Sequence, residues 1–328
     1  MRRSRSSWLL AGVVATSAFA AGCATTGEAK AARHTARVRT LQTQLIARGD
    51  ADSLAASALF ARELGTSGDL KPLDAATNAA ALDLAARAVA AAPDRADLLL
   101  EQLQLCQAVP SCDSESLEAR LRQLDPENGM PWTYALMRAA GSNDPEAMRR
   151  ARAGLARSQR VDWYWNQIVS HTTAAAAGRA GFNPDDAMIE VIGIESAFPA
   201  PLQPVTRICS VQEVQQPEVL AQCRQIAAAL RRADTSLFQI VGMNLAIRLW
   251  PEGSVERAQI AAERRALHYR TDLMNRNEAK VNSVAALRKL AVLLGRYRTE
   301  PEAFHALFVE LGLNPDPPAD WVDHTPGG

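Results

Sequence analysis

Two helix–turn–helix units follow one another in residues 96–156, which read ADLLLEQLQLCQAVPSCDSESLEARLRQLDPENGMPWTYALMRAAGSNDPEAMRRARAGLA. Apolar residues recur at helical spacing through this stretch, and turn residues interrupt them. The pattern predicts four helices, at 96–106, 114–124, 131–140 and 145–156. Ala147 and Ala151 are small residues where the last pair of helices is expected to approach closely. The stretch therefore predicts antiparallel helix pairs.

Helix-start signals recur along the rest of the chain. Asp144-Pro145, Asn183-Pro184 and Glu300-Pro301 each combine a polar residue with a proline that suits the first turn of a helix. Alanine, the strongest helix former, makes up roughly a fifth of the chain, whereas aromatic residues are only 5%. We find no run of period-two alternation, so the sequence predicts an all-α protein of about fourteen helices.

A repeat of helix ends suggests how the hairpins stack. The ends are marked by Ala92-Pro93-Asp94, Asp125-Pro126-Glu127 and Gln159-Arg160-Val161, so that Pro93, Pro126 and Arg160 are spaced by 33 and 34 residues. With Trp132 near the expected tryptophan position, residues 78–158 resemble the tetratricopeptide repeat, and the resemblance could extend to Ala180. It implies a right-handed superhelical stack of helical hairpins. A plain helical bundle with a chance spacing is the alternative.

The N-terminus has the features of an export signal. Arg2, Arg3 and Arg5 precede a mostly apolar run from Trp8 to Ala21, which is too short to span a bilayer. The run ends in Ala20-Ala21-Gly22-Cys23, which resembles the lipobox of bacterial lipoproteins, although Ala20 stands where that family usually has Leu. A secretory peptide cut beside an incidental Cys23 is the alternative.

The lipobox resemblance implies that Cys23 carries a diacylglyceryl thioether and becomes the new N-terminus after cleavage. Acyl chains such as palmitate would anchor it firmly, because each buried methylene contributes about 0.8 kcal/mol. Ala24 lies where family members retained at the inner membrane often have Asp. The resemblance therefore implies an outer-membrane lipoprotein whose body faces the periplasm.

Charge and composition exclude several classes of protein. The chain has 328 residues with 36 basic and 36 acidic side chains, so it lacks the positive charge of a nucleic-acid-binding protein. Removal of three arginines with the signal leaves a mildly acidic mature chain without a polybasic segment, and membrane contact is expected through the lipid alone. A hydrophobic content of 48% excludes global disorder.

The remaining cysteines form two local pairs. Cys106 and Cys112 are six residues apart, and Cys209 and Cys223 are fourteen apart. In an oxidising envelope these neighbours are predicted to form two disulfides, with four reduced core thiols as the alternative. The sequence contains no Cys-x-x-Cys motif, and no histidine lies near either pair, so a metal site is not indicated.

These signals divide the chain into segments. The predicted divisions are a signal peptide at 1–22, a lipidated tether at 23–32, tetratricopeptide-like repeats at 33–198, a loop at 199–216 pinned by Cys209–Cys223, C-terminal hairpins at 217–312 and a flexible tail at 313–328. Four prolines, from Pro199 to Pro217, are the reason for the loop, and a free linker between two subdomains is the alternative.

The sequence contains one candidate catalytic acid. Residues 191–198, VIGIESAF, resemble the Glu-Ser-x-Phe motif of soluble lytic transglycosylases, in which Glu195 would be a general acid cleaving glycan strands. The following motifs of that family are missing, so a solvated Glu195 near a helix end is our interpretation. The sequence indicates no cofactor and no metal ligand set, because no histidines pair at helical spacing and no phosphate-binding loop occurs.

Three functions are compatible with these sequence features. The leading prediction is a non-enzymatic scaffold that binds unidentified envelope proteins through the concave surface of its repeats. The alternatives are a degenerate peptidoglycan-cleaving enzyme using Glu195, and a module that binds a small ligand between helices with Trp163 and Trp165 as a stacking shelf. These tryptophans could instead cap the core, and the Arg231-Arg232 and Arg264-Arg265 pairs are expected to lie on solvated faces. A deep cleft at Glu195 would favour the enzyme, and an open groove the scaffold.

Overall fold

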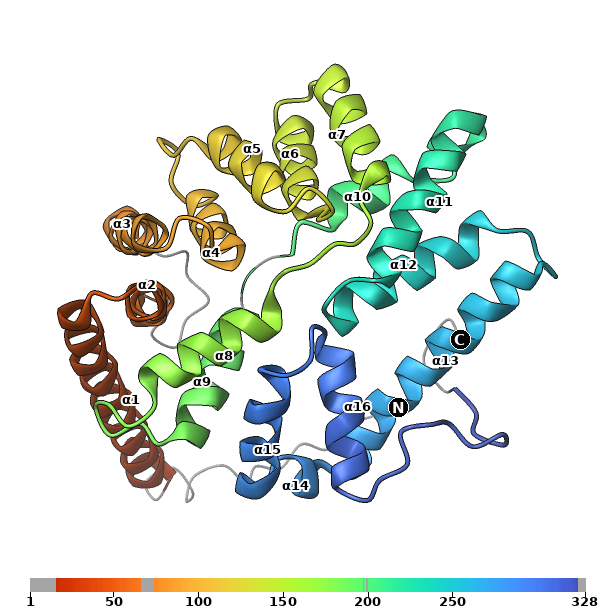
Figure 1. Ribbon diagram of the computed structural model, residues 1–328. Coiled ribbons are helices and arrows are strands. Elements are labelled where there is room, and N and C mark those ends of the chain that lie inside the picture. The colour runs from red at the N-terminus through yellow and green to blue at the C-terminus, as the bar shows by residue number, and fades with distance from the viewer. Residues whose placement is uncertain (1–15, 66–73, 197, 199, 324–328) are drawn as a thin grey trace, which may run out of the picture.

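The computed structural model describes residues 16–65, 74–196, 198 and 200–323, and this part of the chain is all-helical (Figure 1). Its α-helices are α1 Thr16–Arg48, α2 Ala51–Gly65, α3 Ala75–Ala91, α4 Ala96–Cys106, α5 Ser114–Leu124, α6 Met130–Gly141, α7 Pro145–Arg157, α8 Trp165–Ala176, α9 Pro184–Ser196, α10 Gln203–Ile208, α11 Pro217–Arg231, α12 Ser236–Leu249, α13 Val255–Arg276, α14 Glu278–Val281, α15 Val284–Leu294 and α16 Glu300–Glu310. A 3-10 helix, η1, covers Glu213–Gln215. The predicted fold class is confirmed, with sixteen described α-helices instead of about fourteen.

The two predicted helix pairs are present. α4 and α5 have the predicted bounds, α6 is one residue longer than predicted at each end, and α7 is one residue longer at its C-terminal end. Ala151 is buried between helices, as expected, whereas Ala147 is partly exposed. The closest approach lies elsewhere: a Cβ added to Gly154 on α7 would lie 2.3 Å from the Trp132 ring on α6. A glycine and a large ring therefore fit together where α6 and α7 meet.

The caps follow the predicted signals with one difference. The Asp144 carboxylate accepts hydrogen bonds from two N–H groups of the first turn of α7, and Asn183 does the same for α9. At α16 the cap is Thr299, whose hydroxyl accepts from the Glu302 N–H while the Glu302 carboxylate accepts from the Thr299 N–H. Glu300 is therefore the first helical residue, which frees its side chain from capping its own helix.

The α8–α9 hairpin lies inside the arc formed by the other helices (Figure 1). From α1 to α7 each helix packs on the next, and the arc continues from α7 to α11, α12 and α13. α8 and α9 both contact α2 near one end of the chain and α15 near the other. The inner hairpin thus joins the two ends of the helical array.

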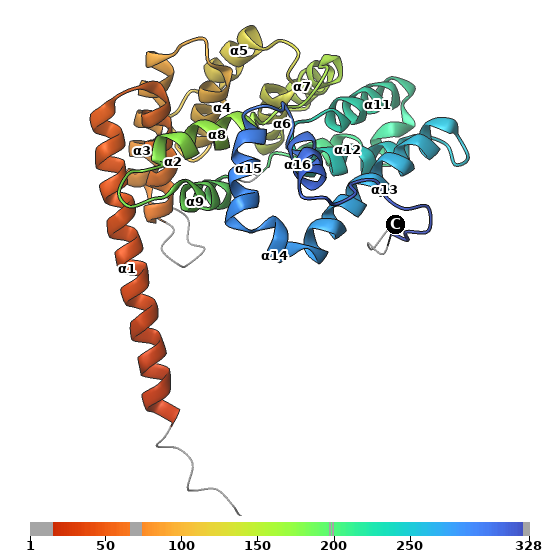
Figure 2. The ribbon, with the colours of Figure 1, turned by 60° about the horizontal axis from the view of Figure 1, so that its bottom comes forward.

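The N-terminal segment differs from the expected tether. Residues 23–32 belong to α1, which projects beyond the body of the protein (Figure 2). Four alanines in this segment explain why a helix forms where a small polar tether was predicted. Residues 1–15 of the predicted signal peptide lie outside the described residues, and lipidation of Cys23 stays a prediction. None of the described helices has the length and hydropathy needed to cross a membrane.

Both predicted cysteine pairings are present as disulfides. Cys106–Cys112 joins the end of α4 to the following turn, and Cys209–Cys223 joins the residue after α10 to α11. The predicted loop at 199–216 is only partly irregular, because it contains α10 and η1. Pro204 lies in the first turn of α10, where a proline costs the helix no hydrogen bond.

The C-terminal segment also differs from its prediction. Up to Asp323, it is held against α13 instead of forming a flexible tail. The Arg265 guanidinium donates to the Trp321 carbonyl at 2.7 Å, and the Trp321 ring packs edge-on against Tyr269. His268 lies 2.6 Å from the Asp323 carboxylate. Polar anchors far apart in sequence hold this proline-rich segment, and no local pattern indicates them. Arg265 therefore contacts protein, although a solvated face was expected.

Candidate functional site

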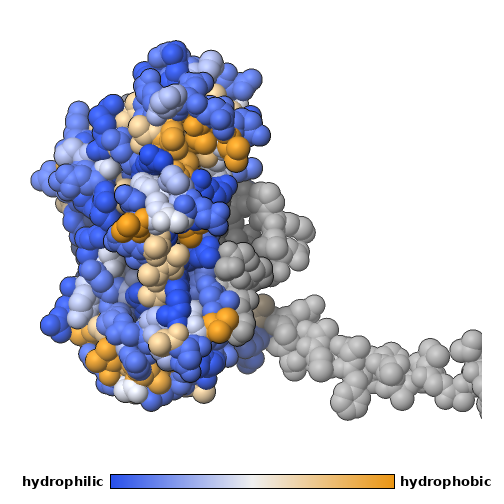
Figure 3. All heavy atoms as spheres, turned by 90° about the vertical axis from the view of Figure 1, so that its right-hand side faces the viewer, coloured by the Kyte–Doolittle hydropathy of each residue, from blue (hydrophilic) through white to orange (hydrophobic). Residues whose placement is uncertain are grey.

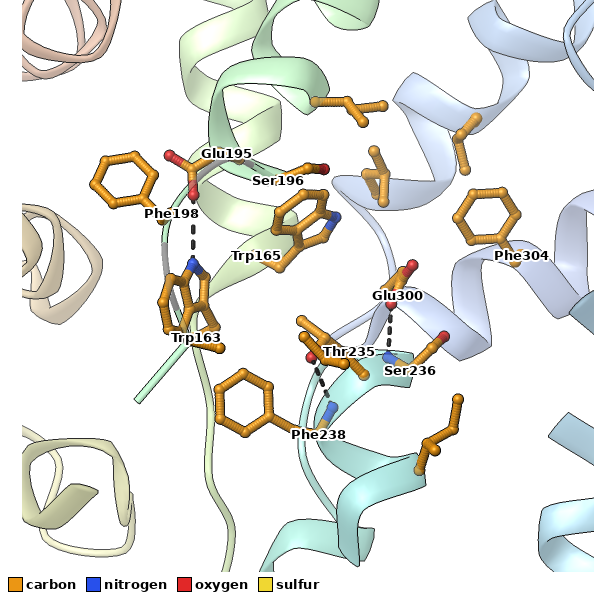
Figure 4. A pocket seen from close by; sticks show the side chains of 16 residues that line it. Trp163, Trp165, Glu195, Ser196, Phe198, Thr235, Ser236, Phe238, Glu300 and Phe304 are labelled. Atoms are coloured by element: carbon orange, nitrogen blue, oxygen red, sulfur yellow. Dashed lines mark hydrogen bonds between the residues drawn. The ribbon is translucent and has the colours of Figure 1, made fainter. Parts of the chain in front are cut away.

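A cavity of about 450 Å³ opens between α8, α9, α12, α15 and α16. Figure 4 shows its side chains projecting from these elements toward one another. Five of the seventeen aromatic residues of the chain line it: Trp163, Trp165, Phe198, Phe238 and Phe304. Its polar lining consists of hydroxyl and carboxyl side chains: Glu195, Ser196, Thr235, Ser236 and Glu300. Aromatic walls with a few polar groups are typical of small-molecule sites.

The turn before α8 is held by an acid from another hairpin. Asp234 accepts hydrogen bonds from the backbone N–H groups of Trp163 and Trp165, at 2.8 and 2.9 Å. Tyr164 lies between them in the left-handed region, with φ of 58°, and offers no side-chain cap to α8. Asp234 thus provides the missing cap and fixes both tryptophans beside the cavity.

The turn before α16 is also hydrogen-bonded to the segment that contains Asp234. The Glu300 N–H donates to the Asp234 carbonyl at 2.7 Å, and the Glu300 carboxylate accepts from the Ser236 N–H at 2.7 Å. The Asn166 side chain donates to the Tyr297 carbonyl at 2.8 Å. Three turns, before α8, α12 and α16, therefore bind one another and form the floor of the cavity.

Glu195 is buried, which corrects the expectation of a solvated side chain. It is 2% exposed, and its Oε2 accepts a hydrogen bond of 3.3 Å from Trp163 Nε1 (Figure 4). Burial raises the pKa of Glu195 to about 8, and the nearby Glu101 contributes to the rise. Within the described part of the chain, Oε1 has no hydrogen-bond partner. The side chain is therefore a buried acid that is mostly protonated at neutral pH.

A group of charged residues, buried except for the partly exposed Arg95, neighbours Glu195. His171 lies 3.4 Å from both the Asp97 and Glu101 carboxylates, and Arg95 pairs with Asp97 at 2.5 Å. Burial opposes the charged imidazole, but the two carboxylates outweigh it and raise the pKa of His171 to about 9. This group stabilises the packing of α4 against α8 and is not part of the cavity lining.

The two predicted shelf residues both line the cavity but differ in exposure. Trp163 is 4% exposed and packs against Phe238, with ring centroids 5.7 Å apart, so it also belongs to the core. Trp165 is partly exposed at the start of α8. The structure therefore brings the predicted shelf and the Glu195 motif together in one site, with Trp165 as the ring that a ligand could reach.

Several site residues were missed at the level of sequence. Glu300, Ser236 and Phe304 lie more than 70 residues from Trp163. Of the three, only Glu300 was marked in the sequence, by a helix-start signal. No group of His, Cys, Asp and Glu within the described residues could hold a metal ion. Arg231, predicted to be solvated, pairs with Glu263 at 2.6 Å.

None of the protein families, curated proteins or solved structures compared with this chain matches it. The geometry of the cavity is therefore the basis for assigning a function.

Proposed function

We propose that the chain is a non-enzymatic, lipid-anchored envelope protein whose aromatic cavity binds a small, largely apolar ligand. The observation that carries this proposal is the cavity itself, which has a volume of about 450 Å³. Five aromatic side chains line it, although aromatic residues make up only 5% of the chain. Its volume lies in the range that holds ligands up to drug size. The linked turns before α8, α12 and α16 support a preformed site, which lowers the entropic cost of binding.

Location in the envelope rests on the sequence. The lipobox resemblance at Ala20–Cys23 and the Ala24 that follows support anchoring at the outer membrane. Two disulfides are consistent with an oxidising compartment.

Binding at the cavity is better supported than binding along a concave repeat surface. The helices expected to line an open groove are α4 and α6. α4 packs against α8, and α6 packs against α10, so segments of the same chain cover both. The face of the molecule on the side of α11–α13 is mostly hydrophilic, with small, separate apolar patches (Figure 3). Capture of envelope proteins stays a prediction.

One observation favours a second function. A general acid must hold a proton at neutral pH, and the raised pKa of Glu195, about 8, meets this requirement. Against this, the carboxyl is buried and its Oε2 is already bonded to Trp163, so a glycan oxygen would have to displace that contact. We expect purified protein to release no soluble fragments from peptidoglycan sacculi. Release that disappears in Glu195→Gln would favour the enzyme.

The proposed binding can be tested with the neutral fluorescent probe N-phenyl-1-naphthylamine and the full chain. Ile240 lies in the cavity wall on α12, so Ile240→Trp fills part of the space. Ile189 is 57% exposed on α9 and lies outside the lining, so Ile189→Trp is a matched control. We expect one saturable site that weakens at least tenfold in Ile240→Trp and is unchanged in Ile189→Trp. Non-saturable binding, or equal effects of the two variants, would contradict the proposal.

A further inference from the structure

We infer that the cavity selects an organic cation, a small ammonium compound whose apolar body lies against the aromatic rings and whose charged nitrogen faces Glu300. This inference rests on the proposed function and names the chemical class of its ligand.

The ionisable side chains that line the cavity are all acidic. Its ionisable side chains are Glu195 and Glu300, and no Lys, Arg or His is among the described residues that line it. A charge moved from water into such a site needs an opposite charge nearby. The Arg62 guanidinium lies 3.7 Å from the Phe198 ring centroid and interacts with Glu195, but it is not part of the lining. Among the lining residues an anionic ligand would meet only carboxyl groups, whereas a cation would meet a partner.

Glu300 is placed to be that partner. One carboxylate oxygen accepts the hydrogen bond from the Ser236 N–H, and no ion pair engages Glu300 within the described residues. Its position as the first residue of α16 favours the ionised form, because the N-terminus of a helix carries a partial positive charge. Burial raises the pKa of Glu300, and a bound ammonium would act in the opposite direction.

The aromatic rings suit the same ligand. Trp165 and Phe304 project toward the middle of the cavity beside Glu300 (Figure 4). The negative face of an aromatic ring attracts an ammonium group, most strongly for tryptophan. Their apolar surface would cover the remainder of the ligand.

A neighbouring arginine, Arg270, does not neutralise Glu300. Arg270 borders a separate cavity of about 70 Å³ that Glu300 and Phe304 also line. Its Nε donates to the Ala266 carbonyl of its own helix, and no ion pair joins Arg270 to Glu300 in the part of the chain described. The carboxylate therefore remains available to a ligand.

Three probes of similar size separate charge from shape: 2-phenylethylammonium, 2-phenylethanol and 3-phenylpropionate. Each is titrated calorimetrically into the full chain at pH 7. We expect the ammonium compound to bind at least tenfold more tightly than the alcohol, and the carboxylate to bind most weakly. Equal binding of alcohol and ammonium, or preference for the carboxylate, would overturn the cation inference while leaving the proposed function standing. Failure of all three to bind would overturn both.

A pair of isosteric variants tests the role of Glu300. Glu300→Gln keeps an oxygen that can accept from the Ser236 N–H but removes the charge. Glu252→Gln is the control, because Glu252 is exposed in the turn between α12 and α13. We expect the preference for ammonium over alcohol to fall below threefold only in Glu300→Gln, with unchanged affinity for the alcohol. An undiminished preference in Glu300→Gln would overturn the assignment.

Discussion

Arg298 binds both carboxylate oxygens of Asp162, with Nη1 at 2.8 and 2.9 Å, although 136 residues separate the two. Asp162 is buried and also accepts a hydrogen bond of 2.6 Å from Arg160. The pair joins the turn before α16 to the turn before α8. These two turns position Glu300 and the two tryptophans in the cavity lining.

Removal of this link should loosen the site. Among the described residues, Arg298→Ala leaves Arg160 as the one cation partner of the buried Asp162, and we expect a loss of about 1–3 kcal/mol in the free energy of unfolding. The control is Arg296→Ala, an exposed residue on the same turn, which should cost no more than about 0.5 kcal/mol. Urea denaturation measures both. Equal effects would show that the Asp162 pair does not hold the turn.

Glu195 should make stability depend on pH. Because burial raises its pKa from 4.5 to about 8, the folded chain binds a proton that the unfolded chain releases between these values. The free energy of unfolding must then fall as pH rises through this range, and the raised pKa values of His171 and Asp234 act in the same direction.

Glu195→Gln removes that titration and keeps an oxygen for the Trp163 hydrogen bond. We expect the variant to match the wild type near pH 5 and to be more stable by at least about 1 kcal/mol at pH 8.5. Urea denaturation at several pH values measures the difference. Parallel pH profiles for the two proteins would contradict the buried, protonated acid.

Two glycines in helices should respond oppositely to alanine. In Gly154→Ala the new methyl group would overlap the Trp132 ring, so we expect a loss of about 1–3 kcal/mol. Gly193 on α9 has no atom within 4 Å of an added Cβ, so Gly193→Ala should stabilise the chain by about 0.4–1 kcal/mol. Thermal unfolding of both variants tests the packing of α6 on α7, and equal changes would argue against it.

The anchor makes a separate prediction about the envelope. Cys23 is the only lipid acceptor that the lipobox resemblance assigns, so Cys23→Ala should yield an unprocessed or soluble protein. Detergent-phase partitioning of cell fractions measures this. Partitioning equal to that of the wild type would contradict lipidation at Cys23.

Local signals explain why much of the fold could be predicted. The bounds of α4 and α5 follow from apolar spacing and the flanking turns, and the disulfides follow from cysteines close in sequence. The tail contacts of Trp321 could not be predicted, because Arg265 and Tyr269 lie about fifty residues away on another helix. The helix bounds depend on residues that are close in sequence, whereas the contacts of Trp321 depend on tertiary packing.

The site was only partly predictable for the same reason. The motif around Glu195 and the Trp163–Trp165 run each marked part of the cavity, but neither pattern reveals that they meet. The burial of Glu195 depends on Trp163, 32 residues away, and Glu300 enters from the last hairpin. Its glutamate-proline sequence indicates only a helix start.

Fluorine NMR of the full chain labelled with 5-fluorotryptophan tests the cavity most directly. The chain has six tryptophans, and Trp163 and Trp165 line the cavity, whereas Trp132 and Trp250 lie outside it. On titration with toluene, a small uncharged apolar compound, we predict saturable shifts of the Trp163 and Trp165 resonances and none for the other two. Absence of saturable shifts at Trp163 and Trp165, or equal shifts at all four, would contradict a ligand-binding cavity.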